Sequence, residues 1–287
     1  MTAFALSLIL AAAVVHASWN YLLKRSGGGV VFVWLFAVIS ALIYAPLAAL
    51  VLWSERPAFG WVHVGLMIAS AVLHTAYYLL LDRGYRSGGD LSVVYPLARG
   101  TGPLITMVAA VLFLGESPSV LAVTGALLIG GGAITLTGDP RKLRQSGNAR
   151  AVGFALLTGC TIASYTLVDK IAVAAWLIPP LVQDWASNLG RVVIMTPMMR
   201  GRADDIRDTW RRAKQEIVAI ALLCPLSYIL VLTAMVFTPV SYVAPAREVS
   251  ILVAALMGAH LLSEENAAQR LAAAGAMVLG IICLAIG

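Results

Sequence analysis

The segment "VYPLARGTGPLITMVAAVLFLGE" at residues 94–116 has a counterpart in the same chain, and this internal match decides how the fold is organised. The counterpart is "YVAPAREVSILVAALMGAHLLSE" at residues 242–264, an offset of 148 residues. In this superposition Arg99 coincides with Arg247, Ala98 with Ala246 and Glu116 with Glu264. A shorter match places "ASWNYLLK" at 17–24 on "ASYTLVDK" at 163–170. The sequence therefore contains two related halves.

The composition identifies the solvent in which these halves fold. Of the 287 residues, 60% are hydrophobic and only 12% are charged, about half the charged fraction of an ordinary soluble protein. Apolar runs of about 17 to 25 residues recur along the chain, each long enough to cross roughly 30 Å of hydrocarbon. The runs are 3–23, 30–53, 61–81, 91–114, 118–137, 151–170, 176–199, 215–237, 240–262 and 268–286.

These ten runs predict an all-α integral membrane protein with ten transmembrane helices. A membrane β-barrel is excluded because its strands alternate apolar and polar residues, whereas these runs are continuously apolar. The first run has no basic residue before its apolar core and is followed by Lys24 and Arg25. We therefore expect it to be retained as a span instead of cleaved as a secretion signal.

Lysine and arginine are distributed unevenly between the two sets of connections. The connections after odd-numbered runs hold fifteen of these residues, whereas the opposite face holds only Arg56 and Lys170. Cytoplasmic loops carry the positive excess, so both termini are expected outside a bacterial-type inner membrane. The net charge of +6 therefore reflects membrane topology. The basic residues lie in short loops between spans and do not form the basic face of a soluble domain that nucleic-acid binding would require.

Five spans in each half give the halves opposite orientations, because five is odd. The expected domains are a first repeat at 1–137, a cytoplasmic linker at 138–150 and a second repeat at 151–287. Inverted repeats of this kind are typical of secondary transporters, which bind substrate between the halves. The polar connection at 200–216 leaves two interpretations open, a solvated loop or an amphipathic helix at the membrane surface.

The segments "PLARGTGPLITMVAAVLFLGE", "PAREVSILVAALMGAHLLSEE" and "HASWNYLLK" resemble the tandem EamA-type domains of the drug/metabolite transporter superfamily. This resemblance covers essentially the whole chain. It implies a ten-helix inner-membrane carrier that exports amino acids or other metabolites, and the aromatic amino-acid exporters are the branch most similar in appearance. The chain departs from a symmetric pattern because Arg247-Glu248 stands opposite Arg99-Gly100, and the second half lacks the His and Trp of "HASWN".

Polar and aromatic residues share helix faces inside the predicted spans and indicate a substrate cavity. His16, Trp19 and Asn20 form one such face, and His74, Tyr77 and Tyr78 form another. The remaining candidates are Tyr95 and Arg99 in the first half and Tyr165, Trp185, Tyr228, Tyr242 and Arg247 in the second. Interhelical hydrogen bonding is the alternative explanation for each of these residues taken singly.

Two roles are open for Arg99 and Arg247. They either bond carbonyls that Pro96, Pro103 and Pro245 leave unpaired, bending the fourth helix, or they line the transport pathway. His16 and His74 are groups that titrate near neutral pH. The sequence predicts no central carboxylate, because Asp184 and Glu248 are expected toward the span ends.

Several function classes lack their residue patterns in this sequence. Cys160, Cys224 and Cys283 have no metal-ligand spacing, and there is no P-loop to hydrolyse ATP. We expect no catalytic residue, no cofactor and no metal. An enzyme would need clustered carboxylates or histidines near the interface, and a channel would show a filter motif.

The expected function is therefore export of amino acids, including aromatic and other apolar ones, or of related metabolites by alternating access. A multidrug or organic-cation exporter of the same fold is the alternative, and a channel-like or structural membrane protein is a further class. The expected partners are a small-molecule substrate and membrane lipid. Monomer and weak homodimer both remain open, because Ala126/Gly130 and Ala276/Gly280 could pack the halves together or form a dimer face.

Overall fold

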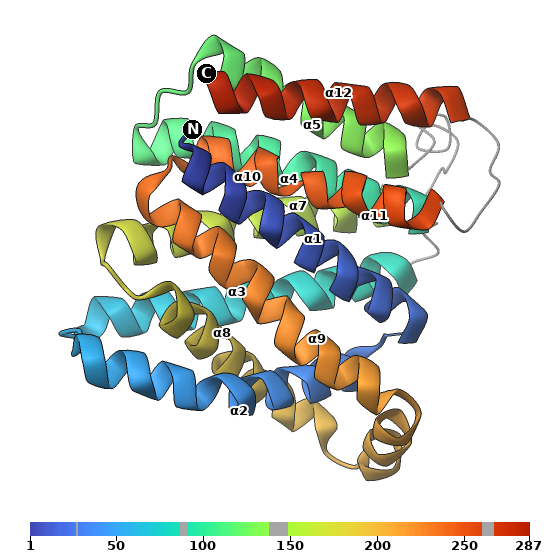
Figure 1. The fold of residues 1–287 in the computed structure, drawn as a ribbon. Helices are drawn as coiled ribbons and strands as arrows, with labels where there is room; N and C mark the ends of the chain where they lie inside the picture. Colours follow the sequence, from blue (N-terminus) through green and yellow to red (C-terminus); the bar gives the residue numbers. More distant parts are fainter. Residues whose placement is uncertain (27, 87–90, 138–148, 260–266) are drawn as a thin grey trace.

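Helices account for every regular element in the part of the chain that the structure, a computed structural model, describes. The described residues are 1–26, 28–86, 91–137, 149–259 and 267–287 (Figure 1). The first-half helices are α1 (Ala3–Ser26), α2 (Val30–Glu55), α3 (Trp61–Arg86), α4 (Leu91–Leu114) and α5 (Val120–Thr137). The second-half helices are α7 (Ala149–Lys170), α8 (Pro180–Met195), α9 (Ala203–Phe237), α10 (Val240–Arg247), α11 (Val249–Ala259) and α12 (Ala267–Ile286). The predicted all-α class is confirmed.

Within the described ranges, six helical stretches are long and apolar enough to cross a membrane. They lie at Ala3–Leu23, Val30–Glu55, Trp61–Leu81, Leu97–Leu114, Val152–Ala175 and Ala203–Phe237. Large apolar side chains also cover the outside of the molecule, with Leu42 66% exposed on α2 and Leu112 71% exposed on α4. An apolar outer surface of this kind needs a cover other than water.

The helices differ from the predicted spans at several places, and three of these differences change the course of a span. α7 continues through a π-helical turn, η1 (Ile171–Ala175), which carries the helix five residues beyond the expected end at 170. α9 begins at Ala203, and a kink at Ala213 separates its charged first part from its apolar second part. The connection at 200–216 is therefore largely helical. A short 3-10 helix, η2 (Thr196–Met199), follows α8.

The third difference is a break in the ninth predicted span. α10 ends at Arg247 and α11 begins at Val249, with Glu248 between them. Pro245 has no N–H for the helix ladder, and the Glu248 N–H turns back to the Pro245 carbonyl at 3.0 Å. For the fourth helix the sequence predicts a break or a bend, and the structure excludes a break, because α4 runs continuously from Leu91 to Leu114.

Both termini lie at the same end of the bundle (Figure 1). The Met1 ammonium group donates to the Ala285 carbonyl at 3.3 Å. At the same end, the two Glu116 oxygens accept the N–H groups of Val240 and Ser241 at 2.8 and 2.9 Å. A glutamate from the first half thus caps the N-terminus of α10 in the second half.

Each half packs extensively against the other. Helix α1 packs on α9 and α11, whereas α3 and α4 pack on α7. Two pairs of equivalent helices also meet, α2 with α8 and α5 with α12. The two halves are therefore interleaved, and residues from both surround the centre of the bundle.

The α5–α12 contact depends on two glycines. A Cβ atom at Gly125 would lie 2.6 Å from the Gly280 carbonyl oxygen, and one at Gly280 would lie 2.7 Å from the Gly125 carbonyl oxygen. Ala126 is 1% exposed beside them. Of the two interpretations of the small residues, packing of the halves against each other is the one that this contact supports.

We predict that Gly125→Ala lowers the unfolding temperature of the detergent-solubilised protein. The free energy of unfolding should fall by about 1–3 kcal/mol, because the added methyl group would collide with the backbone carbonyl of Gly280. Gly131→Ala on the same helix is the control, since nothing lies within 4 Å of its Cβ position. Thermal unfolding checks both variants. Equal melting temperatures for the two would contradict the close α5–α12 contact.

Candidate functional site

Six charged side chains are buried among the described residues, and their charges balance. Three are arginines and three are acids: Arg99, Arg191, Arg247, Asp169, Asp184 and Glu248, each at most 6% exposed. Burial of an unpaired charge is costly, so such groups must be paired or hydrogen-bonded. We call these six residues the buried charge cluster.

One part of the buried charge cluster forms around the helix break at Glu248. The Arg99 Nε lies 2.9 Å from the Glu248 Oε2, and the Arg247 Nε lies 3.9 Å from Oε1. Arg99 also donates from Nη2 to the Ser250 hydroxyl at 3.2 Å. The two repeat-related arginines therefore share one carboxylate. Through Glu248 and Ser250, Arg99 of α4 also connects the first half to the second.

An aromatic group lies beside Arg247 of the buried charge cluster. The His74 ring stacks on Tyr165, with centroids 4.1 Å apart, and meets Tyr228 edge-on at 5.3 Å. The Tyr77 ring lies 6.1 Å from Tyr165. Arg247 donates from Nη2 to the Tyr165 hydroxyl at 3.3 Å. Four of the residues predicted from the sequence to share a cavity are thus brought together with Arg247.

Asp169 is the central residue that sequence reasoning missed. It is fully buried on α7, accepting hydrogen bonds from the Gln183 amide at 2.8 Å and from the Tyr228 hydroxyl at 2.5 Å. The His74 Nε2 lies 4.0 Å from the same carboxylate. The expectation that the spans contain no central carboxylate is therefore wrong.

Helix α8 supplies two further members of the buried charge cluster, Asp184 and Arg191, together with neutral polar residues. Gln183, Asp184, Ser187, Asn188 and Arg191 lie on its buried face. Asn188 donates to Asp184 at 3.0 Å and accepts from Arg191 at 3.0 Å, so one amide bridges two opposite charges. The Arg191 guanidinium lies 4.8 Å from the centroid of the Tyr78 ring, within the range of cation–π attraction.

Several other predicted site residues bond locally or lie at a distance from the cluster. Asn20 donates to the His16 carbonyl, and the Trp19 indole donates to the Ser227 hydroxyl. The Trp185 indole donates to the Ala41 carbonyl of α2 at 2.9 Å. Tyr242 lies at the end of the bundle that holds both termini, where its hydroxyl contacts Ser119 and Gly287. The side chain of Tyr95 is outside the part that the structure describes.

Several buried polar atoms of this region have no hydrogen-bond partner among the described residues. They include the donors Arg191 Nε and Arg247 Nε, the carbonyl oxygen Gln183 Oε1, and His16 Nε2. Leaving such a group unpaired in the interior costs about 1–3 kcal/mol. The cluster therefore presents both donors and acceptors for further hydrogen bonds.

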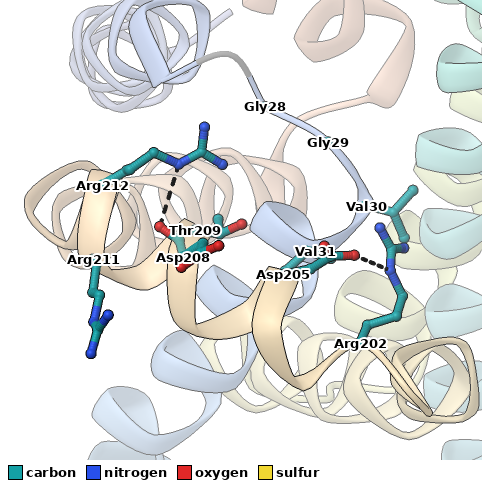
Figure 2. A pocket seen from close by; sticks show the side chains of 10 residues that line it. All are labelled: Gly28, Gly29, Val30, Val31, Arg202, Asp205, Asp208, Thr209, Arg211 and Arg212. Atoms are coloured by element: carbon teal, nitrogen blue, oxygen red, sulfur yellow. Dashed lines mark hydrogen bonds and ion pairs between the residues drawn. The ribbon is translucent and has the colours of Figure 1, made fainter.

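Two clefts lie away from the cluster, near opposite ends of the bundle. The first, of about 750 Å³, is formed by Gly28–Val31 and the first part of α9. In Figure 2, Arg202 forms an ion pair with Asp205, and Arg212 donates to the backbone carbonyl of Asp208. The second, of about 460 Å³, surrounds Met1, Glu116 and Tyr242. Internal pairing makes the first cleft a weaker candidate site than the buried charge cluster.

No group of three or more His, Cys, Asp or Glu side chains among the described residues is arranged to hold a metal ion. The three cysteines are not bonded to one another. The side chains of the site offer charge pairing, hydrogen bonding and aromatic contact.

Comparison with protein-family models finds no match, and no curated protein matches the chain. Among solved structures, 28 chains match. One, described as "Crystal structure of protein", has a TM-score of 0.79 and 12% sequence identity, and the match covers 100% of this chain and 98% of that chain. At this identity the likeness shows a shared fold over the full length and carries no functional statement.

We predict that Glu248→Gln strongly destabilises the protein, by about 3–5 kcal/mol, because it leaves Arg99 and Arg247 without their shared carboxylate. Asp205→Asn is a matched control, since its ion pair with Arg202 has the same length of 2.9 Å but is exposed. We expect this control to change stability by less than about 1 kcal/mol. Similar losses of thermal stability in both variants would show that burial of the contacts between Glu248 and the two arginines is unimportant.

Proposed function

We propose that the protein is embedded in a bacterial-type inner membrane. Six long apolar helices and an apolar outer surface support this placement, because lipid is the solvent that accommodates both. The buried charge cluster also fits a lipid-facing exterior, since intramembrane charges face the protein interior and pair there. The first part of α9, with Trp210 36% exposed, fits the membrane–water interface.

The proposed architecture is ten spans in two inverted repeats, with α10 and α11 forming one interrupted span. Helix pairing supports it, because exchanging the halves converts α3–α7 into α9–α1 and α4–α7 into α11–α1, and all four contacts exist. The pairs α2–α8 and α5–α12 map onto themselves. This is the arrangement expected of alternating-access carriers.

Within this architecture, we assign the protein to secondary transport of small organic solutes. The observation that carries this proposal is a charged and aromatic cluster built from both halves inside an apolar bundle. His74 and Arg99 come from the first half, and Asp169 and Arg247 from the second. A rearrangement of one half against the other would change access to all of them. The sequence resemblance to EamA-type exporters supports export as the direction.

Amino acids are the substrate class that the site favours. The cluster contains both charge signs beside tyrosine rings, which suits a solute with an ammonium group, a carboxylate and an apolar side chain. Organic cations are the second candidate, and Asp169 with Tyr165 and Tyr228 nearby is the feature that favours them.

Counterflow in proteoliposomes tests the proposal. Vesicles loaded with an unlabelled amino acid are expected to accumulate labelled Phe, Met or Thr in a saturable manner. Saturable exchange of organic cations with no amino-acid exchange would favour the second candidate. Absence of exchange for both classes, from protein that elutes as one species and unfolds cooperatively, would overturn the transport proposal.

We predict that His74→Ala and Tyr78→Ala each lower the exchange rate by roughly 10-fold, because each removes an aromatic ring that contacts other side chains of the site. His74 contacts two tyrosines in the cluster, and Tyr78 lies against Arg191. Tyr242→Phe, at the end that holds the termini, is the control and should exchange at the wild-type rate. Wild-type rates in both cluster variants would remove these residues from the site.

We predict from the charge distribution that the end holding both termini faces the periplasm. In a full-length protein with its three cysteines replaced by alanine, Ser117→Cys should react with an impermeant maleimide added outside the cell. Asp204→Cys at the opposite end should react only after the membrane is opened. The reverse labelling pattern would invert the topology.

A further inference from the structure

We infer that the buried charge cluster is a two-pole site for a zwitterion, in which Arg247 receives the carboxylate and Asp169 with Gln183 receives the ammonium group. This inference rests on the proposed transport function and states which residues of the site bind each charged group of the substrate. It also distinguishes amino acids from solutes that carry a single charge.

The carboxylate pole follows from the unequal neutralisation of two arginines. Glu248 lies 2.9 Å from the Arg99 Nε but 3.9 Å from the Arg247 Nε. The Arg247 Nε has no hydrogen-bond partner among the described residues, although Arg247 is only 5% exposed. Arg247 therefore retains a buried donor and incompletely countered positive charge, which suit a second carboxylate.

The ammonium pole follows from the partners of Asp169. Its carboxylate accepts from the Gln183 amide and the Tyr228 hydroxyl, both of which are neutral donors. The His74 Nε2 is farther away, at 4.0 Å. The Gln183 Oε1 is fully buried and has no partner in the described part of the chain. A carboxylate and an unpaired carbonyl oxygen thus present acceptors for an ammonium group.

Two tyrosines join the poles. Tyr165 accepts from Arg247, and Tyr228 donates to Asp169. Their rings lie 6.2 Å apart, and the Arg247 guanidinium carbon lies 6.0 Å from each centroid. Both poles are therefore attached to the same pair of rings. An α-amino acid carries its two charged groups on one carbon atom, so its two groups would bind close together, as the shared tyrosines require.

Charge balance gives an independent reason to favour a zwitterion. The cluster already contains equal numbers of buried arginines and acids. A zwitterion adds no net charge, whereas an organic cation or an organic anion adds an uncompensated charge to a low-dielectric interior. The site should therefore reject amines and acids that lack the second pole.

The test compares an amino acid with its two singly charged analogues as inhibitors of counterflow. For phenylalanine these are 2-phenylethylamine and 3-phenylpropionate, and the same comparison applies to Met or Thr if either exchanges faster. In the wild-type protein, we expect each analogue to inhibit roughly 10- to 100-fold more weakly than the amino acid. An analogue that inhibits as strongly as the amino acid overturns the two-pole assignment.

Charge-neutral variants assign each pole to its residue. Asp169→Asn should weaken inhibition by the amino acid and leave inhibition by 3-phenylpropionate unchanged. Arg247→Gln should weaken inhibition by the amino acid and leave inhibition by 2-phenylethylamine unchanged, and Arg247→Lys should recover part of the amino-acid affinity. Tyr242→Phe, remote from both poles, is the control.

Each outcome bears on one proposal. If both pole variants weaken inhibition by all three compounds equally, the residues act structurally and the assignment is wrong. If a variant does not fold, the wild-type comparison of the three compounds still decides between a zwitterion and a singly charged ligand. Failure of the wild-type protein to exchange any solute overturns the transport proposal itself, whereas normal exchange in the pole variants overturns only this inference.

Discussion

The sharing of Glu248 by Arg99 and Arg247 is the interaction on which the centre of this fold depends. All three side chains are buried, and an unpaired charge in the interior is strongly unfavourable. The carboxylate lies at the break between α10 and α11, where Pro245 interrupts the helix ladder. Because Arg99 comes from α4, the same contact connects the two halves.

The asymmetry between the halves has a steric reason. Gly100 lies within the continuous helix α4. It packs so closely on α5 that a Cβ atom at this position would collide with the Ile134 side chain. Its repeat-related position is Glu248, which lies at a break and has room for a long side chain directed at both arginines. A glutamate at position 100 is incompatible with the α4–α5 contact. One copy of the repeat therefore supplies the carboxylate, and the two copies together supply the arginines.

Much of the helical fold could be predicted from the sequence, because apolar run length determines where helices of this kind occur. The internal match at an offset of 148 residues identified Arg99 and Arg247 as related positions, but it did not predict that both contact Glu248. Contacts between helices could not be predicted, because periodicity shows which residues share one face of a helix but not which other helix packs against that face. Trp185 shows this, since it lies beside Asp184 in sequence but bonds the backbone of α2.

Asp169 was missed for a reason that is local to its helix. It precedes Lys170, and the apolar run was expected to end there, which would place the carboxylate near water. The π-helical turn at Ile171–Ala175 carries the helix further, and Lys170 bonds the carbonyls of Met235 and Thr238 at the end of α9. The lysine thereby satisfies a helix C-terminus, while Asp169 faces inward toward Gln183 and Tyr228. π-helical turns are frequent at functional sites, and this turn begins two residues after the buried Asp169.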